Sequence, residues 1–210
     1  MKPEYILTDQ GSEEWAKLKL GVISASNISK AIAKVGSETR NSYMMELVAQ
    51  IATQEHEEIN SKYIEWGKTQ EPFARSRYEF ETNDQVDQIG FIYNLDKRIG
   101  CSPDGIITNK KKGLEIKCPF TGKVHVDFLA MEKIKPEYYC QIQFGLFVSG
   151  LEIWDFCSFH PKFQKTPIKI ITIGRDEKLM ERFKNDIGEF ILDMDSILDR
   201  LNLKWGQQWE

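Results

Sequence analysis

The stretch CSPDGIITNKKKGLEIKCP, residues 101–119, decides the fold class predicted for this chain. Two short runs of alternating apolar and polar residues flank a lysine run and a glycine, which predicts a β-hairpin. Residues two apart in a strand point to the same face. Glu115 and Lys117 therefore share one face, while Ile116 and its apolar neighbours face the other way. The lysine run 110–112 is expected to be only the solvated tip of this hairpin.

The hairpin is expected to bring Asp104, from the Pro-Asp-Gly turn, beside Glu115. Two carboxylates at short range raise each other's pKa unless a cation lies between them. Carboxylate oxygens together with water suit Mg²⁺. Lys117 would then hold or deprotonate an attacking water, or stabilise charge on a phosphate. The pattern therefore favours metal-assisted phosphodiester hydrolysis.

A simpler alternative is a solvated Glu–Lys pair on an exposed strand face, with Asp104 as an ordinary turn residue. Glu-x-Lys alone occurs by chance in most proteins. Pro-Asp followed eleven residues later by Glu-x-Lys, across a predicted hairpin with apolar flanks, is more specific. The spacing therefore favours the nuclease interpretation.

Length and composition predict one soluble globular domain over residues 1–210, with 41% apolar and 29% charged residues. Its expected parts are N-terminal helices (12–82), a sheet core (85–175) and a C-terminal helix (177–202). No apolar window is long enough for a transmembrane helix. The N-terminus lacks the apolar core of a signal peptide. A cytoplasmic protein is expected.

The order of helical and extended segments predicts an α/β fold with a central sheet flanked by helices. Apolar spacing and capping residues predict the helices, and alternation predicts the strands. Pro72 is expected in the first turn of its helix, and the first three strands are expected to form an antiparallel run. The expected helices are 12–20, 24–34, 42–53, 70–82, 137–149 and 177–202, and the expected strands are 85–94, 98–108, 113–120, 151–159 and 168–175.

The cysteines, the histidines and the charge limit the classes of site and ligand that the chain could have. The four cysteines contain no CxxC pair and the three histidines lie far apart, which argues for free thiols and against zinc or iron–sulfur sites. A net charge of −4 argues mildly against a general nucleic-acid binder. Residues 101–135 nevertheless hold seven lysines against four acids. That local excess suits a protein that holds an anion in one groove.

Several separate blocks resemble one known family. They occur in the family's order and span most of the chain. The chain resembles the lambda exonuclease or YqaJ-type viral recombinase family of PD-(D/E)xK nucleases, which implies a restriction-endonuclease-like core with a central mixed β-sheet flanked by helices. The blocks are EEWAKLKLGVISAS (13–26), IEWGKTQEPFAR (64–75), CSPDG (101–105), LEIKCPF (114–120), YYCQIQF (138–144) and GQQWE (206–210).

The resemblance implies a metal site at the hairpin. Asp104 and Glu115 match the metal-binding acids, with the backbone carbonyl of Ile116 as a further ligand, and Lys117 matches the catalytic lysine. Glu71 matches a glutamate that supports a second metal, although at a helix N-terminus it could equally be a capping acid. The implied cofactor is Mg²⁺, as two ions, with Mn²⁺ as a substitute.

Other matched positions lie on the helices. Gln141 matches a glutamine that approaches the attacking water or the scissile phosphate, and its alternative is an exposed helix glutamine. Tyr138 shares that helix face and is expected to line the groove. Ile64 matches a residue that wedges into the duplex end, and its alternative is a core isoleucine beside Trp66. Trp15 and Trp66 are both expected in the core.

Ser26 matches a serine that contacts the 5′-phosphate end. A helix start suits that role, although simple N-capping is the alternative. Lys19 stands where the family has an arginine, so the charge is kept but the bidentate fork is lost. A second family arginine has no clear match, and Lys34 and Arg40 are the nearest candidates.

The resemblance implies a Mg²⁺-dependent 5′→3′ exonuclease acting on double-stranded DNA ends. It would release mononucleotides and leave 3′ single-stranded overhangs for phage-type annealing recombination. It also implies a ring-shaped homotrimer, a single-strand annealing protein as partner, and a phage or prophage gene expressed in the cytoplasm of a bacterial host cell. The alternatives are a structure-specific endonuclease of the same fold and a non-catalytic DNA-binding module.

Overall fold

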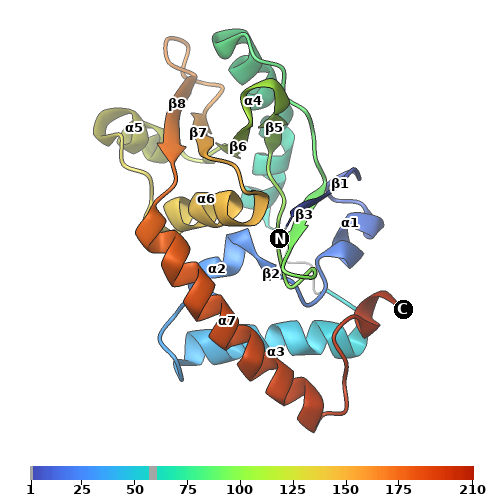
Figure 1. Cartoon of the computed structure of the whole chain (residues 1–210). Helices are drawn as coiled ribbons and strands as arrows, with labels where there is room; N and C mark the ends of the chain where they lie inside the picture. Colours follow the sequence, from blue (N-terminus) through green and yellow to red (C-terminus); the bar gives the residue numbers. More distant parts are fainter. Residues whose placement is uncertain (1, 57–60) are drawn as a thin grey trace.

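The structure, a computed structural model, describes residues 2–56 and 61–210 as two β-sheets with helices on their faces (Figure 1). The strands are β1 (Glu4–Ile6), β2 (Ile23–Ser24), β3 (Phe91–Asn94), β4 (Ile99–Cys101), β5 (Gly105–Ile107), β6 (Lys112–Lys117), β7 (Ile153–Phe159) and β8 (Ile168–Gly174). The helices are α1 (Glu13–Leu18), α2 (Ile28–Ala31), α3 (Glu38–Thr53), α4 (Lys62–Thr82), α5 (Gly122–Met131), α6 (Pro136–Ser149) and α7 (Glu177–Arg200), with 3₁₀ turns at Ala25–Asn27, Thr108–Lys110 and Gln207–Trp209.

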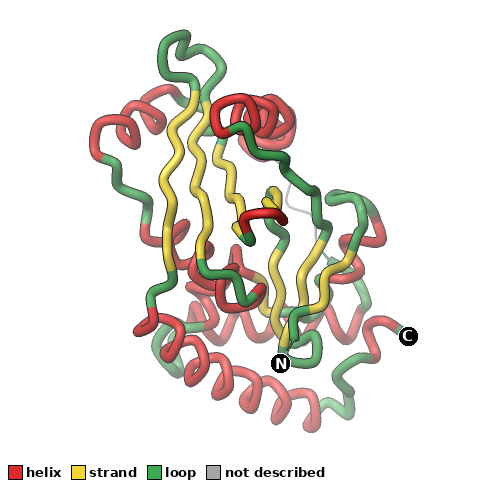
Figure 2. The backbone as a smooth tube through the Cα atoms, turned by 45° about the horizontal axis from the view of Figure 1, so that its top comes forward, coloured by secondary structure: helices red, strands yellow, loops and turns green. Residues whose placement is uncertain are grey.

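Both sheets are four-stranded and mixed. The first has the order β1-β3-β4-β2, and the second has the order β5-β6-β7-β8. The β2–β4 and β6–β7 pairs are parallel, and the other pairs are antiparallel. Figure 2 shows the strands as two neighbouring groups. The predicted α/β class with a mixed sheet flanked by helices is therefore confirmed.

The single strand predicted over 98–108 is wrong. The chain forms β4 in the first sheet, crosses over at residues 102–104, and then forms β5 in the second sheet. Pro103 has no N–H to donate to a strand ladder, which favours a break at this point. The predicted three-stranded antiparallel run is wrong for the same reason, because β3 and β4 belong to one sheet and β5 and β6 to the other. Asp104 ends the crossing.

The predicted bounds of three helices are also wrong, and the helix predicted over 42–53 begins four residues earlier, at Glu38. The helix predicted over 70–82 begins at Lys62, where the Ser61 side chain accepts a hydrogen bond from the Ile64 backbone N–H. Pro72 consequently lies inside α4 rather than in a first turn. The helix predicted over 24–34 consists only of a 3₁₀ turn and the short α2. The sequence interpretation also missed three elements: β1, β2 and α5.

Helices α4 and α6 cover opposite faces of the second sheet. Leu114 and Ile116 pack with Ala74 and Tyr78 of α4, whereas Glu115 points to the α6 side. The alternation predicted for this strand is confirmed. Helix α6 also packs on the first sheet through β3 and β4, and α7 crosses α3 and contacts α6 (Figure 1). Both sheets thus share α6, and the main hydrophobic core surrounds it.

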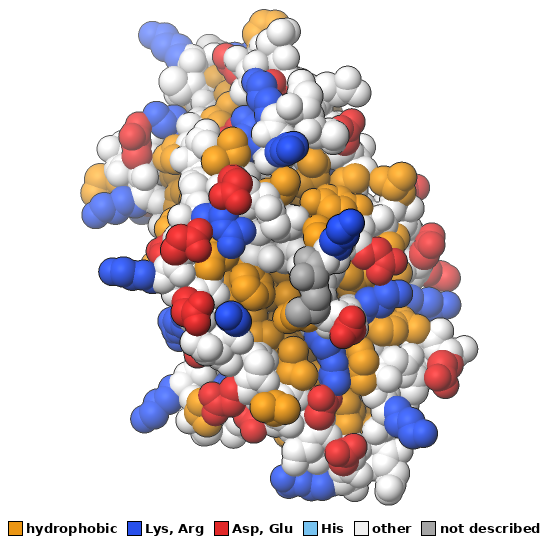
Figure 3. Space-filling view, viewed as in Figure 1, with side chains coloured by type: hydrophobic (Ala, Val, Ile, Leu, Met, Phe, Trp, Pro, Cys, Tyr) orange, Lys and Arg blue, Asp and Glu red, His pale blue; other side chains and the backbone are white. Residues whose placement is uncertain are grey.

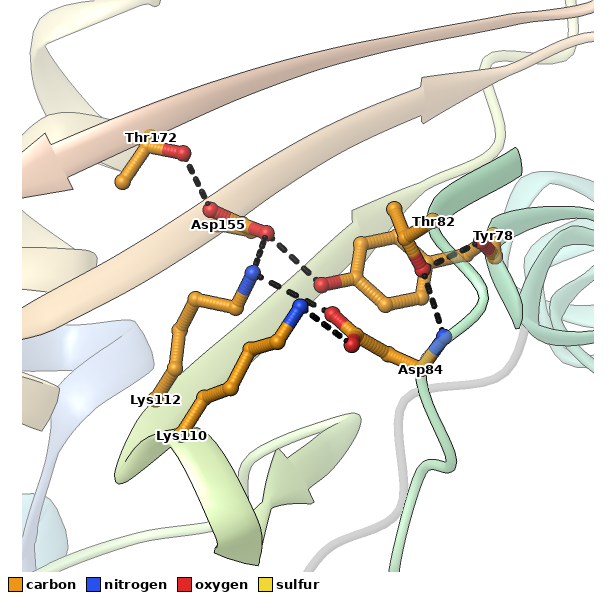
Figure 4. A network of polar contacts seen from close by, with 7 residues as sticks. All are labelled: Tyr78, Thr82, Asp84, Lys110, Lys112, Asp155 and Thr172. Carbon is orange, nitrogen blue, oxygen red and sulfur yellow. Dashed lines mark hydrogen bonds and ion pairs between the residues drawn. The ribbon is translucent and has the colours of Figure 1, made fainter. Parts of the chain in front are cut away.

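The lysine run 110–112 is not simply a solvated tip, because Lys112 lies in β6 and is only 8% exposed. Its ammonium lies 2.5 Å from Oδ2 of Asp155 in β7 and 3.6 Å from Oδ2 of Asp84 (Figure 4). Lys110 reaches the other Asp84 oxygen at 2.5 Å. These contacts join the start of β6 to the loop after α4.

Asp155 receives two further hydrogen bonds in this network. The Tyr78 hydroxyl of α4 donates to Oδ2 at 2.7 Å, and the Thr172 hydroxyl of β8 donates to Oδ1 at 2.6 Å (Figure 4). Burial and the Asp155 carboxylate raise the pKa of Tyr78 well above its ordinary value. The buried Asp155 carboxylate therefore connects α4 to β6, β7 and β8.

All four cysteines are free thiols, as expected; Cys101 and Cys157 are buried, and Cys118 and Cys140 are half-buried. Trp15 and Trp66 are half-buried rather than fully in the core. The Trp15 indole N–H donates to the Gly90 carbonyl at 3.0 Å and to the Ser102 hydroxyl at 2.9 Å. Within residues 2–56 and 61–210, no helix combines the length and apolar character needed to cross a membrane.

Candidate active site

The structure brings Asp104, Glu115 and Lys117 together where the chain passes from the first sheet to the second. Oδ2 of Asp104 accepts a 2.5 Å hydrogen bond from the backbone N–H of Ile116. The Asp104 backbone N–H donates to the Leu114 carbonyl at 3.1 Å. The carboxylate of Asp104 is therefore fixed against the β6 segment that carries Glu115 and Lys117.

Glu115 is the most buried acid of this group, with 3% of its surface exposed. Its Oε1 accepts hydrogen bonds from the Lys117 ammonium and, at 2.7 Å, from the Gln141 side-chain amide. Gln141 comes from α6, which covers this face of the sheet. The expected approach of Gln141 to the site is therefore present, and its alternative as a free surface glutamine is wrong.

Glu71 reaches the same region from the middle of α4, so its alternative role as a capping acid at a helix N-terminus is wrong. Its Oε1 lies 2.5 Å from the Arg75 guanidinium one turn later. The Arg75 Nε–H also donates to the backbone carbonyl of Asp104 at 3.3 Å. Burial raises the pKa of Glu71, Arg75 lowers it, and Glu115 raises it, with a net upward shift. Arg75 was not predicted from the sequence, although its spacing from Glu71 is that of a helical ion pair.

Burial and neighbouring charges shift the pKa values of Asp104 and Lys117. Burial and the charge of Glu115 hold the pKa of Asp104 well above its usual range, and the nearby Lys117 only partly offsets this. Burial alone lowers the pKa of Lys117, but the Glu115 and Asp104 carboxylates raise it above its ordinary value. The two carboxylates therefore favour the ammonium form of Lys117.

The donor set fits a divalent cation in its chemistry. Asp104 and Glu115 offer carboxylate oxygens on adjoining segments, and burial, followed by the charge of Glu115, raises the pKa of Asp104. Among the described residues, no group of three or more His, Cys, Asp and Glu side chains converges as a preformed metal cage. Glu71 is engaged by Arg75. A cation would therefore draw on Asp104 and Glu115.

One cavity of about 380 Å³ joins this cluster to the predicted phosphate site. Asp104, Glu115, Lys117 and Gln141 line it together with Lys19 and Ser26. The Lys19 ammonium lies 3.2 Å from the centroid of the Trp15 ring, and the Ser26 hydroxyl lies 3.2 Å from that of Ser24. Positions more than a hundred residues apart in sequence, such as Lys19 and Gln141, thus share one cavity.

The structure corrects the reasoning behind the phosphate site. Ser26 lies inside a 3₁₀ turn, so it is neither the N-cap of a long helix nor placed at a helix N-terminus. Arg40 is buried and bound to Asp193 at 2.8 Å, and neither Arg40 nor Lys34 lines the cavity. The sequence interpretation missed His56, which does line it. No spacing or motif links His56 to the other lining residues, so only the tertiary structure could reveal it.

Ile64 and Tyr138 lie outside this cavity. Ile64, in the first turn of α4, is 39% exposed, so its alternative as an ordinary core isoleucine is wrong. Tyr138 lines a neighbouring cavity that also contains Lys117, whose ammonium lies 5.1 Å from the Tyr138 ring centroid.

Figure 3 shows acidic and basic side chains interspersed over one face of the molecule rather than separated into large fields.

Comparison with known proteins gives a consistent result. The family model described as the YqaJ-like viral recombinase domain matches residues 14–152. Over 78 residues, 37% of this chain and 90% of the relative, the sequence is 32% identical to the protein ExoD of Escherichia coli (strain K12).

Solved structures extend the likeness to most of the chain. Alkaline exonuclease LHK-Exo from Laribacter hongkongensis is 29% identical, with a TM-score of 0.82 over 91% of this chain and 96% of that one. Its complex with dAMP is 30% identical, with a TM-score of 0.82 over 90% and 96% of the two chains. A phage-related exonuclease from Haemophilus somnus 129PT, 13% identical with a TM-score of 0.64 over 86% and 96%, supports the fold alone.

Proposed function

This chain belongs to the YqaJ-like viral recombinase domain family, and from that premise we propose that it is a metal-dependent 5′→3′ exonuclease acting on double-stranded DNA ends. It would release mononucleotides and leave 3′ single-stranded overhangs. The observation that carries the proposal is the single cavity in which Asp104, Glu115, Lys117 and Gln141 meet Ser26. The likeness to an alkaline exonuclease over 96% of that enzyme's chain supports it.

The proposed metal is Mg²⁺, as two ions, with Mn²⁺ as a substitute. Asp104, Glu115 and the Ile116 backbone carbonyl would hold it, with Glu71 supporting the second ion. Bound Mg²⁺ supplies a water nucleophile at neutral pH and neutralises charge on the phosphate. The donor set suits this ion because it consists of oxygen atoms.

The chain's own residues would perform the remaining steps. The water oxygen would attack phosphorus and lose a proton to solvent. The bond to the leaving 3′ oxygen would break, that oxygen would take up a proton, and the remaining strand would keep a 5′-phosphate. The protonated Lys117 orients the water and stabilises negative charge on the phosphate oxygens. Gln141 holds Glu115 in place through its amide. Positioning and electrostatic stabilisation thus account for these residues' part in the reaction.

Residues in the cavity and at the start of α4 would select the DNA end. Lys19 and Ser26 are proposed to bind the terminal 5′-phosphate, and Ile64, exposed at the start of α4, to part the strands. We further propose a homotrimer, a single-strand annealing protein as partner, and a phage or prophage origin with action in the cytoplasm of a bacterial host cell. Family membership alone supports these last proposals.

Digestion of a 5′-labelled linear duplex beside a closed circle, in Mg²⁺, tests the proposal. The linear DNA should yield labelled mononucleotide from the start of the reaction, while the circle stays intact. Cutting of the circle would indicate an endonuclease of the same fold instead. Binding of DNA ends without any hydrolysis, in either Mg²⁺ or Mn²⁺, would indicate a non-catalytic DNA-binding module. The mass of the protein in solution tests the trimer.

The end preference has a separate test. Ser26→Ala and Lys19→Ala should each reduce the preference for a 5′-phosphorylated duplex over a 5′-hydroxyl duplex, because each removes a donor to the phosphate. Initial rates on the two duplexes measure the preference. An unchanged ratio of rates in both variants would remove these residues from the phosphate site.

A further inference from the structure

A second cavity, of about 430 Å³, adjoins the candidate active site. Among the described residues it shares a single lining residue, Lys117, with the first cavity. We call it the α5–α6 groove, because α5, the start of α6 and the ends of β6 and β7 form it. Its lining residues are Lys117, Cys118, Pro119, Val124, Asp127, Phe128, Met131, Lys133, Ile134, Lys135, Tyr138, Phe156 and Ser158.

Aromatic rings form much of the apolar lining of the α5–α6 groove. The Phe128 and Phe156 rings meet edge to face at 5.1 Å, and Tyr138 stacks on Phe156 at 5.9 Å. Val124 and Met131 line the groove and are exposed to solvent. Phe128 and Phe156 are themselves buried. The accessible apolar surface is therefore made by the half-buried Tyr138 and the exposed Val124 and Met131. The aromatic face of a nucleobase can pack on such a surface.

The charges around the α5–α6 groove favour a polyanion. Lys133 and Lys135 line it beside Lys117, whose ammonium is already paired with Glu115. Its single acidic lining residue among those described is Asp127. Asp127 Oδ2 is already bound at 2.6 Å by the ammonium of Lys123. This basic rim stands out in a chain whose net charge is −4. An apolar floor with a basic rim is the arrangement that binds unpaired nucleic-acid strands.

We propose that the α5–α6 groove binds the base of the nucleotide that carries the scissile phosphate, on a strand separated from its complement at the duplex end. This inference rests on the proposed function. With the terminal nucleotide in the cavity of Ser26 and the scissile phosphate beside Lys117, the next nucleotide continues into the groove that shares Lys117. Stacking in the groove offsets part of the cost of unpairing the base.

A matched pair of variants on α5 tests the proposal. Val124 lines the groove and is 36% exposed, whereas Val126 is 45% exposed and is not among the lining residues. Val124→Glu should weaken binding of a 5′-phosphorylated duplex end about tenfold, because it places a carboxylate, of the same charge sign as DNA, in the groove and removes apolar surface. Val126→Glu should bind as the unmodified protein does. Fluorescence anisotropy in EDTA measures the affinity without turnover.

Equal affinities of the two variants would overturn the proposal. Met131→Glu provides a second groove variant, and thermal unfolding checks that each protein is folded. A groove variant that binds DNA normally but loses affinity for a single-strand annealing protein would assign the groove to a protein partner and also overturn the proposal.

Photocrosslinking tests which nucleotide enters the groove. With 5-iodouracil at the second position from the 5′ end of the strand to be digested, irradiation should link the DNA to a peptide containing Phe128 or Tyr138. With 5-iodouracil at the first position, that peptide should not be labelled. The proposal would be overturned if this peptide were crosslinked from the first position alone, or from neither position. Because binding and crosslinking need no turnover, an absence of hydrolysis in Mg²⁺ or Mn²⁺ would contradict the proposed function separately.

Discussion

The side-chain amide of Gln141 in α6 donates a 2.7 Å hydrogen bond to Oε1 of Glu115 in β6. The same oxygen accepts from the Lys117 ammonium. The candidate active site is therefore held by a helix that also packs on the first sheet, so the relative position of the two sheets affects the geometry of one carboxylate.

Replacing Gln141 by Ala should reduce metal affinity or activity about 10- to 100-fold, the usual loss when a partner that orients a metal ligand is removed. The reason is that the Glu115 carboxylate would lose the donor that fixes its orientation. Initial rates at several Mg²⁺ concentrations measure the effect, and Glu137→Ala, exposed on the same helix, is the control. A loss of equal size in both variants would point to damage of α6 rather than to the contact.

Replacing Lys117 by Ala should reduce hydrolysis by a factor on the order of 10² to 10⁴, the range for groups that act on protons or charge in the transition state. Binding of DNA ends should be retained, because the other cavity residues remain. Single-turnover digestion and end binding measure the two effects. Lys165→Ala, exposed outside both cavities, is the control. Unchanged digestion by the Lys117 variant would end the assignment of its role.

Metal binding should tighten as the pH rises. Burial, Glu115 and Glu71 raise the pKa of Asp104, and a carboxyl group must lose its proton before it coordinates a metal. Apparent affinity should rise about tenfold per pH unit for each proton displaced, and level off above the native pKa of Asp104. Calorimetric titration with Mg²⁺ across pH measures this slope, which Asp104→Asn should remove. A slope that survives Asp104→Asn would assign the proton to another group.

The raised pKa of Asp104 also determines how the stability of the metal-free protein changes with pH. A carboxyl group whose folded-state pKa is raised stabilises the metal-free protein fully below its unfolded pKa. That contribution is lost as the pH rises through the folded-state pKa. The metal-free protein should therefore lose stability over this window, and Mg²⁺ should restore it.

Lys112→Ala should destabilise the protein by about 3–5 kcal/mol, because it leaves the buried carboxylates of Asp155 and Asp84 without their shared ammonium. Lys110→Ala removes a partner of Asp84 that is 50% exposed, and should cost only about 0–1 kcal/mol. Urea unfolding of both variants measures the difference. Similar costs for the two lysines would mean that the network in Figure 4 does not depend on burial.

Local patterns predicted much of the fold and the centre of the site. Alternation in β6 correctly placed Glu115 and Lys117 on one face, because side-chain direction in a strand repeats every two residues. The amphipathic repeat of α7 and the proline in the first turn of α6 likewise predicted these helices within a few residues. Each of these features depends on neighbours within one or two turns of the chain.

The sequence by itself determined which residues alternate, where α6 and α7 run, and which acids and lysine could form a metal-dependent site. Only the tertiary structure decided that β4 and β5 belong to different sheets, that Lys112 is buried against Asp155, and that His56 lines the cavity. Lys112 and Asp155 are 43 residues apart, so no local period links them. Burial and pairing across such separations depend on how sheets and helices pack.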